Sequence, residues 1–245
     1  MTAVGIIPAR YASQRFPGKP LADILGKPMI QWVYQQASAA KRLRQVLVAT
    51  DDERIYQTVA AFGGNVEMTS PAAANGTERI AEIARRLDDP LIVNIQGDEP
   101  LIRPDVIDQL VELMVQNPQA PVGTLVTKIA DDGVPADPNV VKVVLDKYQF
   151  AIYFSRFAIP YRRGKIIGDF PYYQHIGIYS YRREFLLELV KLPQLPLENA
   201  EQLEQLRILE HGFKIKAALT DVNSLGVDVP EDIEKVKSYM MENSL

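Results

Sequence analysis

The sequence predicts an α/β fold with three layers, in which a mostly parallel central sheet carries helices on both faces. Apolar, strand-like runs alternate with helical patterns through the first half of the chain, and this β-α-β-α order is typical of parallel sheets. The run at 91–95 is typical of a fully buried strand, as expected where both faces of a sheet are covered. The 245 residues are enough for one large α/β domain.

The first half of the chain is predicted from its periodicity and its helix boundaries. Pro28 stands in the first turn of the first helix, Asp51 or Asp52 can cap the second, and Gly63–Gly64 end it. Ligands in such sheets bind beyond the carboxyl ends of the strands, so a site is expected in the loops there. The predicted strands are 3–8, 45–50, 66–68, 91–95 and 121–127, and the predicted helices are 28–40, 53–62, 77–87 and 104–116.

The second half of the chain is less regular. Residues 155–174, with Pro160 and Pro171, form a long predicted loop, and loops of that length are often functional. We interpret residues 1–245 as one domain with an inserted β-rich lid or dimerisation region at about 128–182. The predicted strands are 139–146, 151–154, 176–181 and 213–219, and the predicted helices are 183–190, 199–211 and 230–242.

The composition excludes several classes of site. The absence of cysteine excludes disulfides, thiolate catalysis and zinc–thiolate centres, and the two histidines are too few for a histidine-rich zinc site. A formal net charge of -4 argues against nonspecific nucleic-acid binding. No apolar run approaches the roughly 20 residues of a membrane helix, and the N-terminus lacks the pattern of a secretory signal. We therefore expect a cytoplasmic protein that binds neither nucleic acid nor membrane.

The loop after the first predicted strand carries the clearest functional signal. Arg10, Arg15 and Lys19 give it three positive charges and no negative one, although the chain as a whole is acidic. At the carboxyl end of a first strand, such a cluster is expected to bind an anion, with a polyphosphate as the best candidate. Ser13 and the backbone N–H groups near Gly18 add further donors. The spacing fits neither a P-loop nor a G-x-G-x-x-G motif, and a solvated basic loop is the alternative.

Two aspartates are candidates for a metal site. Asp98 follows the strand at 91–95 through Gln96–Gly97 and is expected to project from the carboxyl end of the sheet. Mg²⁺ prefers oxygen ligands and is usually held by one or two carboxylates together with substrate phosphates. Asp228, just before the last predicted helix, is the candidate second ligand, although the spacing does not show that the two aspartates meet. Capping of a helix or turn is the alternative role for both.

A series of motifs runs along the chain. The loop has the pattern Arg10-x-x-Ser13-x-Arg15-x-Pro17-Gly18-Lys19-Pro20-Leu21, and further motifs lie at 75–79, 94–100, 141–144, 153–156, 175–179, 203–207 and 226–232. The loop resembles the signature of the cytidylyltransferases that activate acidic sugars. Together the motifs resemble the 3-deoxy-manno-octulosonate (Kdo) cytidylyltransferases, also called CMP-Kdo synthetases, over almost the whole chain and in the right order.

The resemblance implies a Rossmann-like nucleotide-diphospho-sugar transferase fold. It implies a reaction in which CTP and Kdo give CMP-Kdo and pyrophosphate for lipopolysaccharide biosynthesis, with Mg²⁺, and a homodimer whose candidate contact is the region 150–180. The catalytic residues implied are Arg10, Lys19, Asp98 and Asp228, of which the two aspartates bind Mg²⁺. The residues implied for CTP are Ala9, Arg10, Ser13, Arg15, Lys19, Asn75, Gly76, Arg79 and Gln96, and those implied for Kdo are Gln96, Arg156, His175, Tyr179, Glu204 and Gln205.

Several of these residues have a structural alternative when they are considered without the resemblance. Asn75 or Thr77 is a typical cap of the helix that follows, and Asn75 stands where many relatives have serine. His175 is typical of a core histidine, and Tyr179 belongs to an alternating strand whose residues are often core. The polar pair at 204–205 lies on a predicted amphipathic helix, where it is free to face solvent.

The sequence is compatible with alternative functions. A CMP-sialic acid synthetase would share the cationic loop, although the segments 153–156 and 175–179 favour Kdo. Another acidic-sugar nucleotidylyltransferase is a broader alternative, and an amino-substituted Kdo is a further candidate sugar. A catalytically silent nucleotide-binding regulatory protein can have the same fold.

Overall fold

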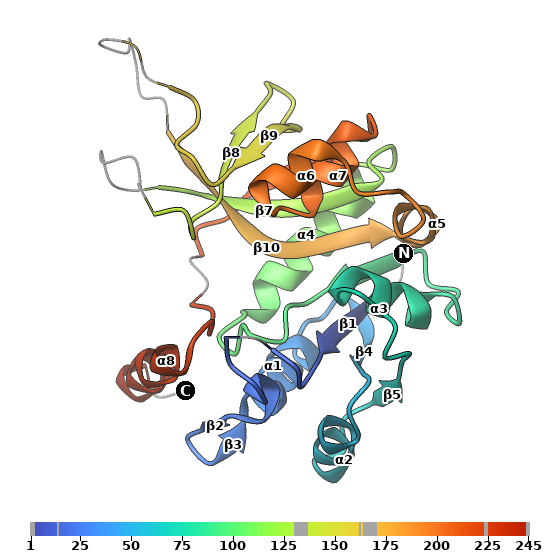
Figure 1. Cartoon of the computed structure of the whole chain (residues 1–245), viewed down its shortest axis with the longest axis vertical. Coiled ribbons are helices and arrows are strands. Elements are labelled where there is room, and N and C mark those ends of the chain that lie inside the picture. The colour runs from blue at the N-terminus through green and yellow to red at the C-terminus, as the bar shows by residue number, and fades with distance from the viewer. Residues whose placement is uncertain are drawn as a thin grey trace.

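The computed structural model has the predicted α/β architecture with three layers (Figure 1). It describes residues 3–13, 15–129, 137–161, 163, 171–222 and 225–243. The strands of the main sheet are β1 (Ala3–Ala9), β4 (Leu43–Thr50), β5 (Val66–Met68), β6 (Leu91–Asn94), β7 (Val122–Lys128), β8 (Lys142–Leu145), β9 (Ala151–Ser155), β10 (Tyr173–Arg182) and β11 (Ile215–Leu219). Within the described residues, the order of the central strands is β11-β7-β10-β6-β1-β4-β5.

The sheet is mostly parallel, with one reversed strand near its middle. β1 runs parallel to β4 and β6, β4 to β5, and β7 to β11. β10 is antiparallel to β6 and β7, the strands on either side of it in this order. The prediction of a mostly parallel sheet is therefore confirmed, and the carboxyl ends of β1, β4 and β6 lie at one edge.

Strands β8 and β9 form an antiparallel pair that joins the main sheet through β10. β10 itself lies in the centre of the sheet, although it falls within the insertion predicted at about 128–182. Residues 130–136, 162 and 164–170 of that segment lie outside the described residues. The role of the region as a lid or dimerisation element stays a prediction.

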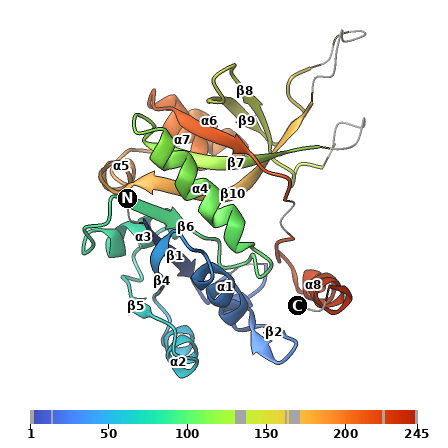
Figure 2. The ribbon, with the colours of Figure 1, turned by 180° about the vertical axis from the view of Figure 1, so that it is seen from behind.

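Alternation along the strands divides the interior of the sheet into two cores, one on each face. Ala3 and Ile7 of β1 belong to the first core, and Val4 and Ile6 to the second, because successive strand residues point to opposite faces. Figure 2 shows the same layers from behind. The first face is covered by α1 (Met29–Ser38), α2 (Glu53–Ala61) and α4 (Pro104–Gln116), and the second by α3 (Gly76–Ala84), α5 (Arg183–Leu189) and α7 (Gln205–Glu210).

Side-chain caps set where two of these helices begin. Asp52 Oδ1 accepts the N–H of Arg54 at 3.0 Å, so Asp52 is the cap of α2. Asn75 Oδ1 accepts the N–H of Glu78 at 2.8 Å, so Asn75, and not Thr77, caps α3. Each cap satisfies a backbone donor that would otherwise have no partner within the helix.

The prediction of one helix over 199–211 is wrong. The segment forms α6 (Pro196–Glu201) and α7, because Gln202 adopts a left-handed conformation with a φ of 52° that ends the first helix. Arg207 and Glu198, both 5% exposed, form a bidentate ion pair across the bend at 2.7 and 2.6 Å. This buried pair holds the two short helices together.

The C-terminal helix packs on the segment that follows the cationic loop. This segment forms elements that the sequence did not predict, the 3-10 helix η1 (Lys19–Leu21) and the hairpin of β2 (Asp23–Ile24) and β3 (Lys27–Pro28). Both ribbon views place α8 (Pro230–Glu242) beside this hairpin, away from the central sheet (Figures 1 and 2). The contact forms a third hydrophobic core, separate from the two cores of the sheet.

Within the part of the chain that the structure describes, no helix has both the length and the apolar content needed to cross a membrane.

Candidate active site

The cationic loop leaves β1 at its carboxyl end and turns into η1. The turn depends on Gly18, whose φ of 74° is in the left-handed region that favours glycine. A Cβ at this position would lie 3.1 Å from the ring of Tyr11, so a larger residue would be crowded as well as strained. The N–H of Gly18 donates to the carbonyl oxygen of Tyr11 at 2.9 Å. These contacts hold the loop folded against the end of the sheet.

A cavity of about 470 Å³ lies at this end of the sheet. It is bounded by the cationic loop, the start of α3 and the residues that follow β6. Its lining includes both candidate metal ligands and every residue that the resemblance implies for CTP. The lining residues are Pro8, Ala9, Arg10, Ser13, Arg15, Lys19, Pro20, Ala73, Ala74, Asn75, Gly76, Arg79, Gln96, Gly97, Asp98 and Asp228.

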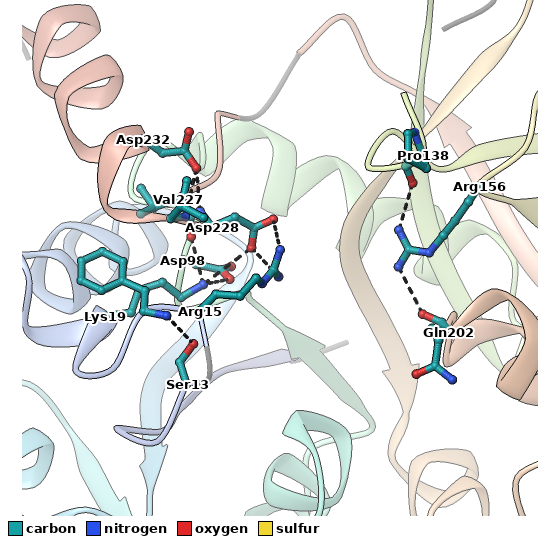
Figure 3. Close-up of polar contacts among 12 residues, drawn as sticks. Ser13, Arg15, Lys19, Asp98, Pro138, Arg156, Gln202, Val227, Asp228 and Asp232 are labelled. Carbon is teal, nitrogen blue, oxygen red and sulfur yellow. Dashed lines mark hydrogen bonds and ion pairs between the residues drawn. The ribbon is translucent and has the colours of Figure 1, made fainter. Parts of the chain in front are cut away.

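Two of the loop cations are paired with the two aspartates in this cavity (Figure 3). Lys19 Nζ lies 2.6 Å from Asp98 Oδ2 and 3.9 Å from Asp228 Oδ1, and it donates to the carbonyl oxygen of Val227 at 2.9 Å. The Arg15 guanidinium donates to both carboxylate oxygens of Asp228, at 3.0 and 3.3 Å. Asp98 and Asp228, which are distant in the sequence, therefore meet across a single ammonium group.

Backbone contacts hold Asp228 in this position. The N–H of Val227 donates to the carbonyl oxygen of Asp98 at 2.9 Å, which ties the segment before α8 to the segment after β6. The carboxylate of Asp232 accepts the N–H groups of Asp228 and Val229 at 3.0 and 3.2 Å. The start of α8 and the position of Asp228 are thus fixed by the same carboxylate.

The two aspartates fit a magnesium site. Both side chains line the cavity and are partly exposed, 34% for Asp98 and 53% for Asp228. Their oxygens are hard donors, and the position of the Lys19 ammonium shows that one cation can lie between both carboxylates. Two carboxylates, completed by phosphate oxygens and water, are a usual ligand set of Mg²⁺.

One wall of the cavity is formed by the start of α3. Gly76 lies against the end of β1, where an added Cβ would contact Pro8 at 3.3 Å. Arg79, 3% exposed, donates to Thr69 Oγ1 at 2.5 Å and to Asp51 Oδ2 at 2.9 Å. The guanidinium of Arg79 therefore holds this wall in place. No sequence motif indicated Thr69 or this role of Asp51, because neither residue belongs to a motif.

Of the residues implied for the sugar, Gln96 is the one that lines this cavity within the described part of the chain. Its side-chain amide donates to the carbonyl oxygen of Gly177 in β10 at 3.0 Å. Gln96 therefore links the cavity to β10, the strand that carries two of the other sugar candidates.

Arg156 joins the end of β9 to the bend between α6 and α7. Its Nε donates to the carbonyl oxygen of Glu201 at 2.8 Å, and its terminal nitrogens donate to those of Pro138 and Gln202 at 3.0 and 3.3 Å. Figure 3 shows the contacts with Pro138 and Gln202 to one side of the Lys19 cluster. The Glu201 carboxylate accepts the backbone N–H of Arg156 at 2.9 Å. The guanidinium is thus bound to backbone carbonyls, an arrangement that no sequence motif indicated.

The remaining sugar candidates gather along β10 and the start of α7. The ring centroid of His175 lies 5.3 Å from that of Tyr179 and 5.1 Å from that of Phe154. The buried hydroxyl of Tyr179 has no hydrogen-bond partner among the described residues, and burial raises its pKa. Burial also raises the pKa of the Glu204 carboxyl, and Gln205 is 9% exposed. An unpaired buried hydroxyl is uncommon in a folded protein and is a candidate contact for a ligand.

We expect His175 to make the protein less stable at acidic pH. Burial lowers the pKa of its ring to about 3, whereas the ordinary value is 6.5. Between these values the unfolded state binds a proton that the folded state does not, so stability falls as the pH falls. The loss is about 2 kcal/mol at pH 5 relative to pH 7. Thermal unfolding of His175→Gln should therefore show a flatter dependence on pH than the wild type, with His211→Gln as the control. Equal slopes for His175→Gln and the wild type would contradict this assignment.

Comparison with known proteins gives a consistent assignment. The family described as cytidylyltransferase matches residues 4–215. A 3-deoxy-manno-octulosonate cytidylyltransferase of Syntrophotalea carbinolica is 50% identical over 98% of this chain and 99% of its own. An 8-amino-3,8-dideoxy-manno-octulosonate cytidylyltransferase of Shewanella sp. (strain W3-18-1) is 52% identical over 98% of this chain and 99% of its own. A solved CMP:2-keto-3-deoxy-manno-octonic acid synthetase, complexed with CTP, is 43% identical with a TM-score of 0.93, covering 99% of this chain and 100% of that one.

The fold, with its cations and acids gathered at the carboxyl end of the sheet, is that of a nucleotidyltransferase, and the chain belongs to the cytidylyltransferase family. Within this family it belongs with the 3-deoxy-manno-octulosonate cytidylyltransferases, several of which are 49–50% identical to it over nearly their full length.

Proposed function

We propose that the protein transfers CMP from CTP to Kdo, giving CMP-Kdo and pyrophosphate. The observation that carries the proposal is a single cavity in which the loop cations and two adjacent aspartates converge. Such a cavity offers the charges that a nucleoside triphosphate and Mg²⁺ require. The likeness to a synthetase solved with CTP supports the same assignment. The proposal places the protein in lipopolysaccharide biosynthesis, in the cytoplasm.

In the proposed reaction the anomeric hydroxyl oxygen of the sugar attacks the α-phosphorus of CTP in line. A P–O bond forms to the sugar, the bond to the β-phosphate breaks, pyrophosphate leaves with the bonding electrons, and the hydroxyl proton passes to solvent. Arg10, Arg15 and Lys19 stabilise the charge on the triphosphate, and one such contact is typically worth on the order of 10²–10³ in rate. Asp98 and Asp228 would hold Mg²⁺, which when bound supplies charge neutralisation at the phosphates.

In the free site the cations and carboxylates pair with one another, and we propose that CTP and Mg²⁺ replace these pairings in an exchange of partners. Lys19 and Arg15 are paired with Asp98 and Asp228, so the groups proposed for the phosphates neutralise the groups proposed for the metal. If a nucleotide binds to the cations without a metal, the two carboxylates lose their partners. If a metal binds to the carboxylates without a nucleotide, Lys19 and Arg15 lose theirs. Leaving a partly buried charge unpaired is unfavourable. We therefore expect Mg²⁺ and CTP to bind with positive coupling.

We propose that the base and the sugar lie on opposite sides of the triphosphate. Asn75, Gly76 and Arg79, on the wall formed by α3, are the proposed neighbours of cytosine. The sugar is proposed to extend from Gln96 toward β10 and the start of α7. There the Tyr179 hydroxyl, which has no hydrogen-bond partner within the described part of the chain, supports a polar ligand. The other proposed contacts of the sugar are Arg156, His175, Glu204 and Gln205.

The release of pyrophosphate tests this proposal. Purified protein with CTP and Mg²⁺ is assayed with Kdo, its 8-amino analogue and a sialic acid, and CTP is compared with other nucleoside triphosphates. We expect release to require CTP and to be fastest with Kdo. The 8-amino analogue is the second candidate, because a relative of 52% identity is named for it. Faster release with sialic acid than with Kdo would make sialic acid the substrate in place of Kdo. Binding of CTP without release of pyrophosphate would indicate a regulatory protein.

We also propose that the protein is a homodimer that associates through the region 150–180, which begins with β9. Large apolar side chains are exposed there, Ile152 by 58%, Phe157 by 79% and Tyr161 by 86%. Large apolar side chains exposed close together in the sequence support an interaction surface in this region. We expect Phe157→Asp to give monomers in sedimentation measurements, whereas Met68→Asp, on edge strand β5, should remain dimeric. A wild-type protein that sediments as a monomer, or a dimeric Phe157→Asp variant, would contradict this.

A further inference from the structure

The last helix is attached to the rest of the protein by a small hydrophobic core of its own. Val236 and Met240 of α8 are fully buried, and Ile233 is 7% exposed. They pack with Ile24 and Met29, which belong to the segment after the cationic loop. Both ribbon views place α8 beside that segment (Figures 1 and 2). The partly buried residues around this third core are Phe16, Ala22, Trp32 and Leu101.

The helix begins directly after the residues that complete the acidic side of the cavity. Val227, 1% exposed, is itself a member of the third core. Its N–H donates to the carbonyl oxygen of Asp98 and its carbonyl accepts the ammonium of Lys19, both at 2.9 Å. Asp228 follows, and its N–H is held by Asp232 in the first turn of α8. The place of Asp228 is therefore set jointly by the packing of α8 in the third core and by the backbone bond from Val227 to Asp98.

We propose that the docking of α8 in the third core positions Asp228 beside Asp98, which makes Val236 and Met240 positioning residues of the active site. The inference rests on the proposed role of Asp228 as a ligand of Mg²⁺. Molecules in which α8 is undocked lack the second carboxylate of the site. The apparent affinity for Mg²⁺ with CTP is then the affinity of the docked state multiplied by the fraction of molecules in which α8 is docked. Saturating concentrations of Mg²⁺ and CTP restore the docked state.

Two adjacent methionines provide a matched test. Met240 is fully buried in the third core, whereas Met241 is 63% exposed. The measured quantities are kcat and the half-saturating concentrations of Mg²⁺ and CTP in pyrophosphate release, well below the melting temperature. We expect Met240→Ala to raise both concentrations about tenfold with an unchanged kcat. Met241→Ala should match the wild type, and Met240→Leu should restore most of the affinity.

A second measurement follows the docking without turnover. Trp32 is the single tryptophan of the chain, is partly buried against the third core, and donates its Nε1–H to the carbonyl oxygen of Ile24 at 2.8 Å. We expect the emission of Trp32 to shift to the red in Met240→Ala and to return toward the wild-type position when Mg²⁺ and CTP are added without sugar. If Met240→Ala does not fold, Ile233→Val replaces it in this measurement, because it removes only one methylene group from the same core. We expect a small red shift of the Trp32 emission in Ile233→Val, which Mg²⁺ and CTP reverse.

The outcomes separate this inference from the proposed function. Unchanged half-saturating concentrations in a folded Met240→Ala variant would overturn the inference, as would a fall in kcat alone, which would indicate loss of folded protein. An equal effect of Met241→Ala would also overturn it. If the wild type releases no pyrophosphate with any sugar, the proposed function fails instead. The response of Trp32 to Mg²⁺ and CTP would still show whether α8 docking is linked to the site.

Discussion

Replacing Asp98 with asparagine is expected to lower kcat for pyrophosphate release by about 10³-fold. Asparagine keeps the size of the side chain but removes the negative charge that the proposed Mg²⁺ site requires. Asp98 Oδ2 lies 2.6 Å from Lys19 Nζ, so it is also the carboxylate that holds this cation in the free site. The fold should persist, because the side chain is 34% exposed at the cavity and the amide oxygen of asparagine can still accept a hydrogen bond from the Lys19 ammonium.

The matched control for this variant is Asp105→Asn. The Asp105 side chain is 62% exposed in the first turn of α4, pairs with Arg103 and does not line the cavity. It should leave kcat unchanged. Initial rates at saturating CTP, Mg²⁺ and Kdo measure both variants, and circular dichroism reports their folding. Near-normal turnover in a folded Asp98→Asn protein would rule out the metal role of this residue.

The helices with strong local boundary signals were predicted most closely from the sequence. The predicted ranges 104–116 and 230–242 are those of α4 and α8 in the structure. Both helices begin at a proline and have acidic residues in the first turn. Proline fixes a φ that suits the first helical position, and acidic side chains interact favourably with the helix dipole. Such effects act over a few neighbouring residues, so the sequence alone displays them.

Elements that depend on distant contacts were predicted less well. The helix expected over 199–211 is broken at Gln202, where neither glycine nor proline marks a bend, and the bend is held by the pairing of Arg207 with Glu198. β10 begins at Tyr173, inside the loop expected over 155–174. Its antiparallel direction follows from pairing with β6 and β7, which come from much earlier in the chain. Local patterns carry no information about such partners.

The candidate site was predictable where its residues directly follow strands. The cationic loop follows β1 and Asp98 follows β6, and because these strands are parallel neighbours, both segments meet at one edge of the sheet. Asp228 was joined to them by the resemblance alone, since its place depends on the packing of α8. No sequence pattern indicated that the carbonyl group of Val227 binds the Lys19 ammonium, because every residue type has a backbone carbonyl.

Lys19→Met is expected to lower kcat/KM for CTP by about 10²–10³-fold while raising the affinity of the free protein for Mg²⁺. The Lys19 ammonium is the common neighbour of Asp98, Asp228 and the Val227 carbonyl. Its removal takes a cation from the proposed triphosphate site and leaves the two carboxylates without that partner. Adjacent like charges favour the binding of an opposite charge. Pyrophosphate release measures the first effect, and calorimetric titration with Mg²⁺ in the absence of nucleotide measures the second.

The opposite signs of these two effects separate a role in binding from a role in stability. Methionine retains the unbranched stem of lysine, so the packing of this side chain, which is 15% exposed, is largely kept. Lys41→Met removes an exposed cation outside the cavity and should change neither quantity. Weaker binding of Mg²⁺ to Lys19→Met would contradict the exchange of partners, because the carboxylates would then need the ammonium to stay in place. A large fall in the melting temperature of Lys19→Met, together with loss of binding of both CTP and Mg²⁺, would instead make Lys19 a structural residue. Its ion pairs with Asp98 and Asp228 would then hold α8 and the loop together.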